Sequence, residues 1–309
     1  MAIVNTQVPI TSESCDSMIR QIVAAYPFCR SELLTATAFQ RPIRTLVIGT
    51  GGRKVLFTAA HHANEWITAL ILLKFGEELA SAIENGGNVF GVPAQLIART
   101  CTIYMVPMVD PDGVDLVVGA IPSGDIQYDL ARQLASNYPQ IPFPDGWKAN
   151  LLGVDLNLQY PAGWLQAREI KFSQGFTRPG PRDYVGRAPL NQLETKALAG
   201  YTEVVDPVLV LAYHSQGEEI YWKFKDIEIP GAEELGQEFA RLSGYTLSNV
   251  PYASGFAGYK DWFIQYFRRP GFTIEVGKGD NPLPLSQFDE IYKDNLGILV
   301  TAALGLPEG

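Results

Sequence analysis

The chain has 309 residues, of which 47% are hydrophobic, and its formal net charge is −9. This size and hydrophobic content are enough to bury the core of one large α/β domain or of two smaller ones. The negative charge and the lack of a long apolar run argue against nucleic acid or a membrane as the main partner.

The first third of the chain alternates between predicted helices and strands. Thr11 to Ser14 offer capping residues for a helix with apolar residues at helical spacing, which should stop near Pro27. A turn at Arg41-Pro42 separates the first two strands. Strands are expected over 33–37, 45–49, 54–57 and 98–106, and a helix over 66–80.

The composition changes after the Asp110-Pro111-Asp112-Gly113 turn. Residues 119–189 are rich in Pro, Gly, Trp and Tyr, with one predicted helix at 129–135, and so long an irregular stretch is usually functional. Further helices are expected over 190–205, 232–242, 260–267 and 285–304, and strands over 207–213, 220–224 and 271–276. This alternation predicts a mostly parallel sheet covered on both faces, in one domain over residues 1–309 with 1–40 as a lead-in helix and strand.

The clearest chemical motif lies where the strand at 54–57 meets the next helix. There, His62 precedes Glu65 by three residues at a strand-to-helix junction, which brings an imidazole and a carboxylate to one point. Such a pair supplies two of the three ligands of a His₂Glu zinc site. The chain has three histidines, His61, His62 and His214, so His214 is the expected third ligand. His214 alone would be interpreted as a hydrogen-bonded core residue, but it follows a buried strand, where open α/β sheets build their sites.

Two acidic residues lie between apolar neighbours. Glu275 is a lone carboxylate in the strand at 271–276, and burying it unpaired would cost several kcal/mol. Beside a metal site, it would be the general base that takes a proton from the attacking water and passes it to the leaving amine. A salt bridge at the strand end is the alternative. Asp155 suits a hydrogen-bond acceptor for the far nitrogen of a metal-bound histidine.

Segments of this chain resemble, in order, the motifs of the zinc carboxypeptidase family. The resemblance implies an α/β/α sandwich around a mixed, mostly parallel eight-stranded sheet. It also implies one Zn²⁺ per chain held by His62, Glu65 and His214, with Glu275 as the base and Asp155 behind His62. The matching segments are His62-Ala63-Asn64-Glu65-Trp66-Ile67-Thr68, Gly153-Val154-Asp155-Leu156-Asn157, His214-Ser215, Asp261-Trp262 and Phe272-Thr273-Ile274-Glu275.

One departure from the family pattern concerns substrate recognition. Leu158 stands where ordinary members have an arginine that clamps the substrate's terminal carboxylate. The surrounding sequences instead resemble one branch, the γ-D-glutamyl-meso-diaminopimelate peptidases, which cut bacterial cell-wall peptides. The segments Trp147-Lys148-Ala149-Asn150 and Arg182-Asp183-Tyr184 also resemble this branch. Some of its members carry an N-terminal wall-binding module, which is not expected in this chain.

Further site residues follow from the resemblance. The family has an arginine that stabilises the oxyanion, and Lys148 is the candidate for that role here, with Arg132 as the alternative. Asn157 is expected to donate hydrogen bonds near the scissile amide. Tyr252 is either the tyrosine that closes over the substrate or a solvated loop residue. Lys260 either lines the specificity pocket or is an exposed lysine at a helix start.

These features predict a zinc metallopeptidase that hydrolyses the γ-D-Glu–meso-diaminopimelate bond of small muropeptides, in cell-wall recycling. An ordinary metallocarboxypeptidase and a zinc deacylase of the same fold remain alternatives, although the missing arginine weighs against both. A silent peptide-binding protein is the third alternative, and the complete set of ligands and base weighs against it. The odd number of cysteines, Cys15, Cys29 and Cys101, and the absence of a signal-peptide pattern lead us to expect unpaired thiols in a cytoplasmic protein.

Overall fold

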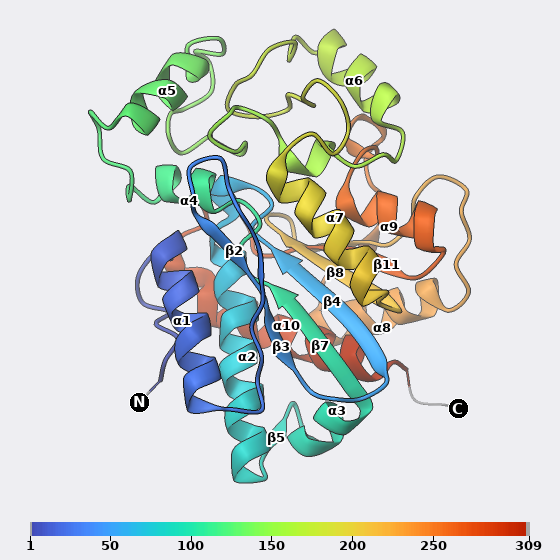
Figure 1. The fold of residues 1–309 in the computed structure, drawn as a ribbon. Coiled ribbons are helices and arrows are strands. Elements are labelled where there is room, and N and C mark those ends of the chain that lie inside the picture. Colours follow the sequence, from blue (N-terminus) through green and yellow to red (C-terminus); the bar gives the residue numbers. More distant parts are fainter. Residues whose placement is uncertain (1, 307–309) are drawn as a thin grey trace.

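A mixed sheet of seven strands forms the middle layer of the protein in the computed structural model, which describes residues 2–306 (Figure 1). The strand order is β10 (Thr246–Ser248), β9 (Glu219–Tyr221), β11 (Gly271–Glu275), β8 (Leu209–His214), β4 (Arg53–Ala59), β7 (Cys101–Val106) and β3 (Leu46–Ile48). The pairs β9–β11 and β3–β7 are antiparallel, and the other neighbours are parallel.

The sheet is covered by helices on both faces, because successive side chains of a buried strand point to opposite sides. On β4, Val55 and Phe57 belong to the larger apolar core, while Leu56 belongs to a second core on the other face. The larger core is closed by α1 (Ser12–Ala25), α2 (Ile67–Asn85), α8 (Ala232–Ser243) and α10 (Phe288–Leu304). The second core is closed by α7 (Leu193–Val205) and α9 (Tyr259–Phe267).

The long segment between β7 and α7 gathers beyond the end of the sheet toward which the arrows of β4 and β8 point (Figure 1). It contains α4 (Pro111–Val117), α5 (Ile126–Ala135) and α6 (Trp164–Ser173). Trp147 is fully buried in a small third core between α4 and α5. The segment therefore covers the carboxyl ends of the central strands, where a site is expected in an open α/β sheet.

Most predicted elements are confirmed, with differences of a few residues at their ends. Residues 98–100 are the end of α3 (Ala94–Thr100) rather than the start of a strand, and a short apolar run fits either structure by its periodicity. Pro42 opens β2 (Pro42–Arg44), which pairs with β1 (Leu33–Ala36), whereas a turn was expected there. Proline is tolerated at the first residue of such an edge strand. The helix α6 and the short hairpin of β5 (Asn88–Val89) and β6 (Val92–Pro93) were not predicted.

The sandwich and the mixed sheet agree with the predicted fold, but the described residues form a main sheet of seven strands rather than eight. Beyond β3, at the edge of the sheet, Arg30 and Val47 exchange backbone hydrogen bonds of 2.9 and 2.8 Å as an isolated bridge. The chain then leaves the sheet to form the separate β1–β2 hairpin. The eighth position therefore holds a single residue pair instead of a strand.

The three cysteines are free and buried, as predicted. Burial raises the pKa of the Cys15, Cys29 and Cys101 thiols to about 12, which makes them poor nucleophiles. Among residues 2–306, no helix combines the length and the hydropathy needed to cross a membrane.

Candidate active site

The turn that follows β4 is shaped by backbone and hydroxyl hydrogen bonds. Ala60 adopts a left-handed conformation with φ of 46°, and its N–H donates to Thr68 Oγ1 at 2.9 Å. The Thr68 hydroxyl donates in turn to the carbonyl of Glu65 at 2.8 Å, and the Asp110 N–H donates to the carbonyl of Ala60 at 2.9 Å. These bonds fix the short helical turn η1 (Ala63–Glu65) between the strand and α2. The side chains at either end of this turn are thereby aimed at one point.

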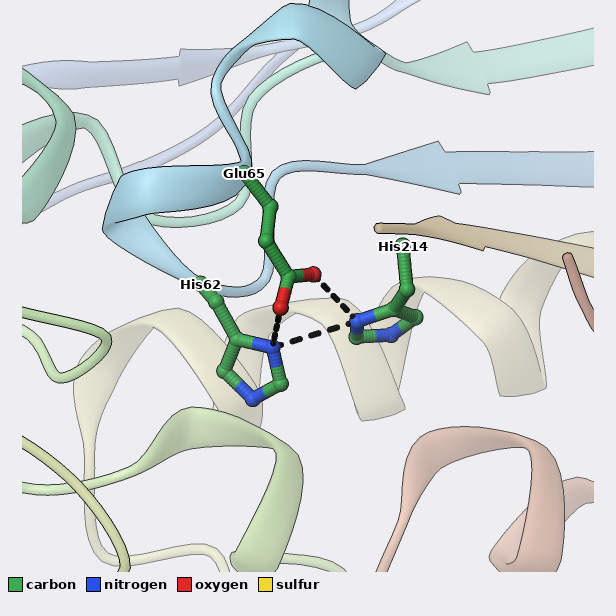
Figure 2. A group of neighbouring side chains, drawn as sticks. All are labelled: His62, Glu65 and His214. Atoms are coloured by element: carbon green, nitrogen blue, oxygen red, sulfur yellow. Dashed lines mark hydrogen bonds and ion pairs between the residues drawn. The ribbon is translucent and has the colours of Figure 1, made fainter. Parts of the chain in front are cut away.

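Three buried side chains meet at this point: His62 and Glu65 from the β4–α2 junction, and His214 from the end of β8 (Figure 2). His62 Nδ1 lies 2.9 Å from Glu65 Oε1, and His214 Nδ1 lies 2.8 Å from Glu65 Oε2. The two Nδ1 atoms are 3.2 Å apart. The Ser215 N–H also donates to Glu65 Oε2 at 3.3 Å, so the carboxylate is held on several sides.

This arrangement fits a metal ion. Two ring nitrogens that face each other at 3.2 Å need a shared cation or proton, because their lone pairs otherwise repel. Ligand nitrogens at a tetrahedral zinc with Zn–N bonds of about 2.0–2.1 Å lie about 3.3 Å apart. One carboxylate and two imidazoles with an open fourth position are the donor set of a catalytic zinc site. His62, Glu65 and His214 would hold the ion.

Asp155 lies behind His62, on the side of the ring away from Glu65. Its Oδ1 is 3.1 Å from His62 Nε2 and accepts a hydrogen bond of 3.1 Å from the Asn157 N–H. Its Oδ2 accepts from the Asp183 N–H at 3.2 Å. Burial opposes the charged form, but the charge and hydrogen bond of His62 hold the pKa of Asp155 well below its usual range. A carboxylate so placed fixes the tautomer of His62 that presents Nδ1 to a metal.

The loop that precedes Asp155 is built around one buried amide. Asn150 Oδ1 accepts hydrogen bonds from the N–H groups of Leu152 and Val154, at 3.2 and 3.1 Å. Gly153 closes the loop with φ of 73°, in the left-handed region that glycine adopts readily. These hydrogen bonds fix the backbone of the loop, and the loop in turn positions Asp155 beside His62.

Glu275 stands at the end of β11 and lines the same cavity as His62 and His214. No hydrogen bond or ion pair joins its carboxylate to another described residue. Burial, followed by the negative charge of Glu65, raises the pKa of Glu275 to about 8. A carboxyl group with a raised pKa and no structural partner is well suited to transfer protons.

Lys148, in the long segment between β7 and α7, lies beside the ligand group. Its Nζ lies 2.9 Å from Glu65 Oε1, and its carbonyl accepts a hydrogen bond of 3.2 Å from the Ala63 N–H. Burial would lower the pKa of Lys148, but the Glu65 carboxylate outweighs it and raises that pKa. The structure thus brings a cationic donor to the edge of the site.

A cavity of about 250 Å³ opens beside these groups, and we call it the site cavity. Most of the residues singled out from the sequence line it, and Leu158, at the position of the missing arginine, lines it too. These residues are His62, Lys148, Asp155, Asn157, His214, Lys260 and Glu275. The sequence motifs therefore converge on one place in the fold.

Two proposed residues do not reach the site cavity. Tyr252 is 73% exposed in η3 (Tyr252–Ser254), and its ring packs edge-on against Phe256 in the wall of a neighbouring cavity. Arg132 is exposed on α5 and does not line the site cavity. Of the two candidates for the oxyanion role, Lys148 lines the site cavity and Arg132 does not, and Tyr252 lies on an exposed loop outside that cavity.

Asn157 and Lys260 are held in place by their neighbours. Asn157 Oδ1 accepts a hydrogen bond of 3.0 Å from the Tyr259 N–H, and its Nδ2 lies 3.5 Å from His214 Nε2. Lys260 is 3% exposed, so the alternative of an exposed lysine is wrong. Its Nζ donates to Asp261 Oδ1 at 2.5 Å and to the carbonyl of Lys223 at 2.9 Å.

Three residues of the site cavity had no role in the sequence interpretation. Arg182 lines the cavity, and its Nε donates to Asp183 Oδ2 at 2.6 Å. Lys171, on the unpredicted helix α6, pairs with Asp183 Oδ1 at 2.6 Å. Arg182 and Asp183 belong to a segment that resembles the peptidase branch, but no role was assigned to them, and only the dense irregular segment at 119–189 pointed to Lys171.

Comparisons with known proteins agree with this geometry. The sequence matches the model of the zinc carboxypeptidase family, peptidase M14, over residues 15–297. It is 42% identical over 282 residues to the γ-D-glutamyl-L-diamino acid endopeptidase 1 of Lysinibacillus sphaericus, with 91% of this chain and 69% of that protein covered. Bovine thrombin-activatable fibrinolysis inhibitor has a similar fold, with a TM-score of 0.72, 15% identity and coverage of 96% of this chain and 97% of that one. The murein-tripeptide amidase MpaA of Escherichia coli O157 aligns with a TM-score of 0.58 and 19% identity, over 90% of this chain and 93% of its own.

Proposed function

Because the chain belongs to the zinc carboxypeptidase family and is a peptidase, we propose that it hydrolyses the amide bond between the γ-carboxyl group of D-glutamate and meso-diaminopimelate in cell-wall peptides. The endopeptidase that is 42% identical to this chain is named for a γ-D-glutamyl-L-diamino acid bond, which supports this substrate class.

The observation that carries the proposal is the apolar side chain of Leu158 in the wall of the site cavity. Leucine cannot form the bidentate pair by which an arginine holds a substrate carboxylate. An enzyme without that clamp must recognise its substrate through other groups. This weighs against peptides that offer the enzyme only a terminal carboxylate, and favours a substrate with further charged groups.

Cationic side chains are instead distributed around the cavity. Lys148, Arg182 and Lys260 all line it, together with the acidic residues Asp183 and Asp261. The proposed substrate carries the α-carboxylate of D-glutamate on the acyl side of the scissile bond, and carboxylates and an ammonium group of diaminopimelate on the amine side. Mixed charges in the cavity therefore match mixed charges on the substrate.

The chemistry follows from the positions of Glu275 and Lys148. Zinc, when bound, acts as a Lewis acid that polarises the scissile carbonyl and lowers the pKa of a water molecule. Glu275 takes a proton from the water whose oxygen attacks the carbonyl carbon, and gives that proton to the amine as the C–N bond breaks. Lys148 stabilises the negative charge that develops on the carbonyl oxygen.

Asp155 acts on a ligand, whereas Asn157 lies beside a ligand and also lines the cavity that receives the substrate. Asp155 orients the His62 ring through the 3.1 Å contact at Nε2. The Asn157 amide, fixed by the Tyr259 N–H, lies beside His214 and presents a donor toward the cavity. Both residues hold the site in one geometry before the substrate binds.

We further propose that the substrates are small muropeptides and that the enzyme works inside the cell, in the recycling of wall material. The three free, buried thiols support a reducing compartment. The site cavity, of about 250 Å³, has room for part of a small peptide.

Incubation with L-Ala-γ-D-Glu-meso-diaminopimelate, with the products identified by mass, tests the proposal directly. We expect L-Ala-D-Glu and free diaminopimelate to form in equal amounts. Neither product should form after zinc has been removed from the enzyme with a chelator. An intact tripeptide after incubation with the zinc-loaded enzyme would refute the proposed substrate.

A further inference from the structure

A second cavity, of about 660 Å³, adjoins the site cavity. The residues that line both cavities are Lys148, Arg182, Tyr221 and Glu275. Glu275 and Lys148 are the groups proposed to act on the scissile bond, so Arg182 borders the space where that bond lies. Arg182 has no part in the chemistry described above, which leaves its position beside the bond to be explained.

The two cavities take opposite sides of the scissile bond. Leu158 stands where the family clamps the terminal carboxylate, which belongs to the amine side of the bond, and Leu158 lines the site cavity but not the second cavity. The amine side of the substrate therefore lies in the site cavity. The acyl side extends from the shared wall toward the second cavity, and Arg182 is the one arginine in that shared wall.

Arg182 belongs to a charge cluster with an excess positive charge. Four cationic side chains line the site cavity, and two of them, Lys148 and Lys260, each pair with a carboxylate of their own. The other two share a single carboxylate: Lys171 Nζ lies 2.6 Å from Asp183 Oδ1, and Arg182 Nε lies 2.6 Å from Asp183 Oδ2. One negative charge between two positive charges leaves this cluster with a net charge of +1.

The free donors of the cluster are on Arg182. The side chain of Lys171 is 9% exposed and that of Arg182 is 43% exposed. Only Nε of the guanidinium is used by Asp183, and within residues 2–306 no hydrogen bond or ion pair involves its two terminal nitrogens. Burial would lower the pKa of Arg182, but the Asp183 carboxylate outweighs it and raises that pKa. The guanidinium is therefore charged, with two nitrogens open to the cavities.

The backbone around Arg182 is fixed to the reacting groups on both sides. The carbonyl of Pro181 accepts a hydrogen bond of 2.7 Å from the Lys148 N–H. On the other side, the Asp183 N–H donates to Asp155 Oδ2 at 3.2 Å, and Asp155 is the partner of a proposed metal ligand. Asp183 also holds the side chain of Arg182 through its carboxylate. The guanidinium therefore has a defined position relative to the proposed metal site.

We propose that Arg182 binds the α-carboxylate of the D-glutamate residue and thereby selects a γ-linked substrate. This inference rests on the proposed function for the identity of the peptide. In a γ-linked peptide the α-carboxylate is free and lies on the acyl side of the scissile bond. In an ordinary α-linked peptide the α-carboxyl group of that residue is itself the scissile carbonyl, so no backbone carboxylate is free there. The two terminal nitrogens of a guanidinium match the two oxygens of a carboxylate, whereas a carboxamide offers one acceptor and no charge.

The test compares kcat/KM for L-Ala-γ-D-Glu-meso-diaminopimelate with that for the same peptide in which the glutamate α-carboxylate is a carboxamide. We expect the wild-type enzyme to favour the carboxylate by about ten- to a hundredfold, as a charge-assisted hydrogen bond gives. In Arg182→Gln this preference should fall to about twofold or less, mainly through a higher KM for the carboxylate peptide. Arg182→Lys, which keeps the charge but not the paired donors, should keep part of the preference.

The matched control is Arg187→Gln, which removes the same charge from an exposed residue of the same segment that lines neither cavity. It should keep the full preference. A third peptide separates the two sides of the bond, because it has a carboxamide in place of the diaminopimelate carboxylate next to the scissile nitrogen. Arg182→Gln should leave the discrimination against this third peptide unchanged.

Three outcomes would overturn the inference and leave the proposed function standing, since the γ-linked bond is still cut. The first is equal kcat/KM for the carboxylate and carboxamide peptides in the wild-type enzyme. The second is an undiminished preference in Arg182→Gln, as a purely structural defect would give by slowing both peptides equally. The third is loss of discrimination against the third peptide instead, which would assign Arg182 to the amine side. If the zinc-loaded enzyme cleaves none of the γ-linked peptides, the proposed function is refuted, and this inference with it.

Discussion

Glu275 and His214 are register partners on the parallel strands β11 and β8, and the Val276 N–H donates to the carbonyl of His214 at 2.9 Å. Their side chains therefore leave the sheet at the same edge. The hydrogen-bonded strands of the sheet place the proposed base beside a proposed metal ligand. The relative position of Glu275 and His214 therefore does not depend on a loop. The predictions below depend on that placement.

The variant Glu275→Gln should keep its zinc and still bind substrate, but its turnover should fall by about 10²–10⁴-fold, because the amide cannot accept and return the proton. Steady-state kinetics together with metal analysis check this. The matched control is Glu219→Gln, the partner of Glu275 on β9, which should retain most activity. Turnover of Glu275→Gln above about a tenth of the wild-type rate would require another base.

The metal assignment predicts one zinc per chain, lost in His62→Ala and in His214→Ala. Removing one of three protein ligands from a catalytic site weakens metal binding severely. Elemental analysis of the purified proteins measures this, with circular dichroism to show that the variants fold. His61→Ala is the control, since His61 is buried next to the site but its Nε2 faces Tyr160 at 3.3 Å. Full zinc occupancy in either ligand variant would rule out the assignment.

Lys148→Ala is expected to lower kcat by about 10²–10³-fold with a small change in KM, as loss of one donor to a developing oxyanion does. Lys148→Arg should recover much of this loss, because a guanidinium also donates hydrogen bonds and stays charged. A kcat effect without recovery by arginine, together with reduced zinc content, would show instead that Lys148 only supports Glu65.

Lys260→Ala should raise KM for the γ-linked tripeptide and also destabilise the protein. The change leaves the buried Asp261 carboxylate without its 2.5 Å partner, and breaking such a pair costs about 3–5 kcal/mol of unfolding free energy. Urea unfolding measures the stability. Adding Asp261→Asn should restore part of the stability but leave KM high. If KM recovers together with stability, Lys260 has no contact with the substrate.

The sequence identified the ligand group because so few residues were available to form it. With three histidines in 309 residues, the spacing of His62 and Glu65 and the strand before His214 left few alternatives. The alternation of helices and strands likewise predicted the layered architecture. Burial of one face of a helix or strand requires apolar residues at a regular spacing. This spacing can be read from the sequence, whereas the exact first and last residues of an element cannot.

The substrate cavities were much harder to predict. Arg182, Lys171 and Asp145 lie in the irregular segment between β7 and α7, where no periodicity indicates which side chains point inward. Tyr252 was proposed from the resemblance alone, and its exposure depends on a loop conformation that local sequence does not specify. Lys260 was left with two alternatives, in the pocket or exposed, because its burial and its pairing with Asp261 depend on the tertiary packing of α9.

The central claim is that this enzyme prefers a γ-linked diamino-acid peptide over ordinary peptides. The most direct measurement is kcat/KM for L-Ala-γ-D-Glu-meso-diaminopimelate against that for an ordinary peptide ending in Phe or Leu, with the same zinc-loaded enzyme. A charge-assisted hydrogen bond to the diamino acid should favour the first by about ten- to a hundredfold. Equal or better turnover of the ordinary peptide would contradict the claim and indicate a plain carboxypeptidase.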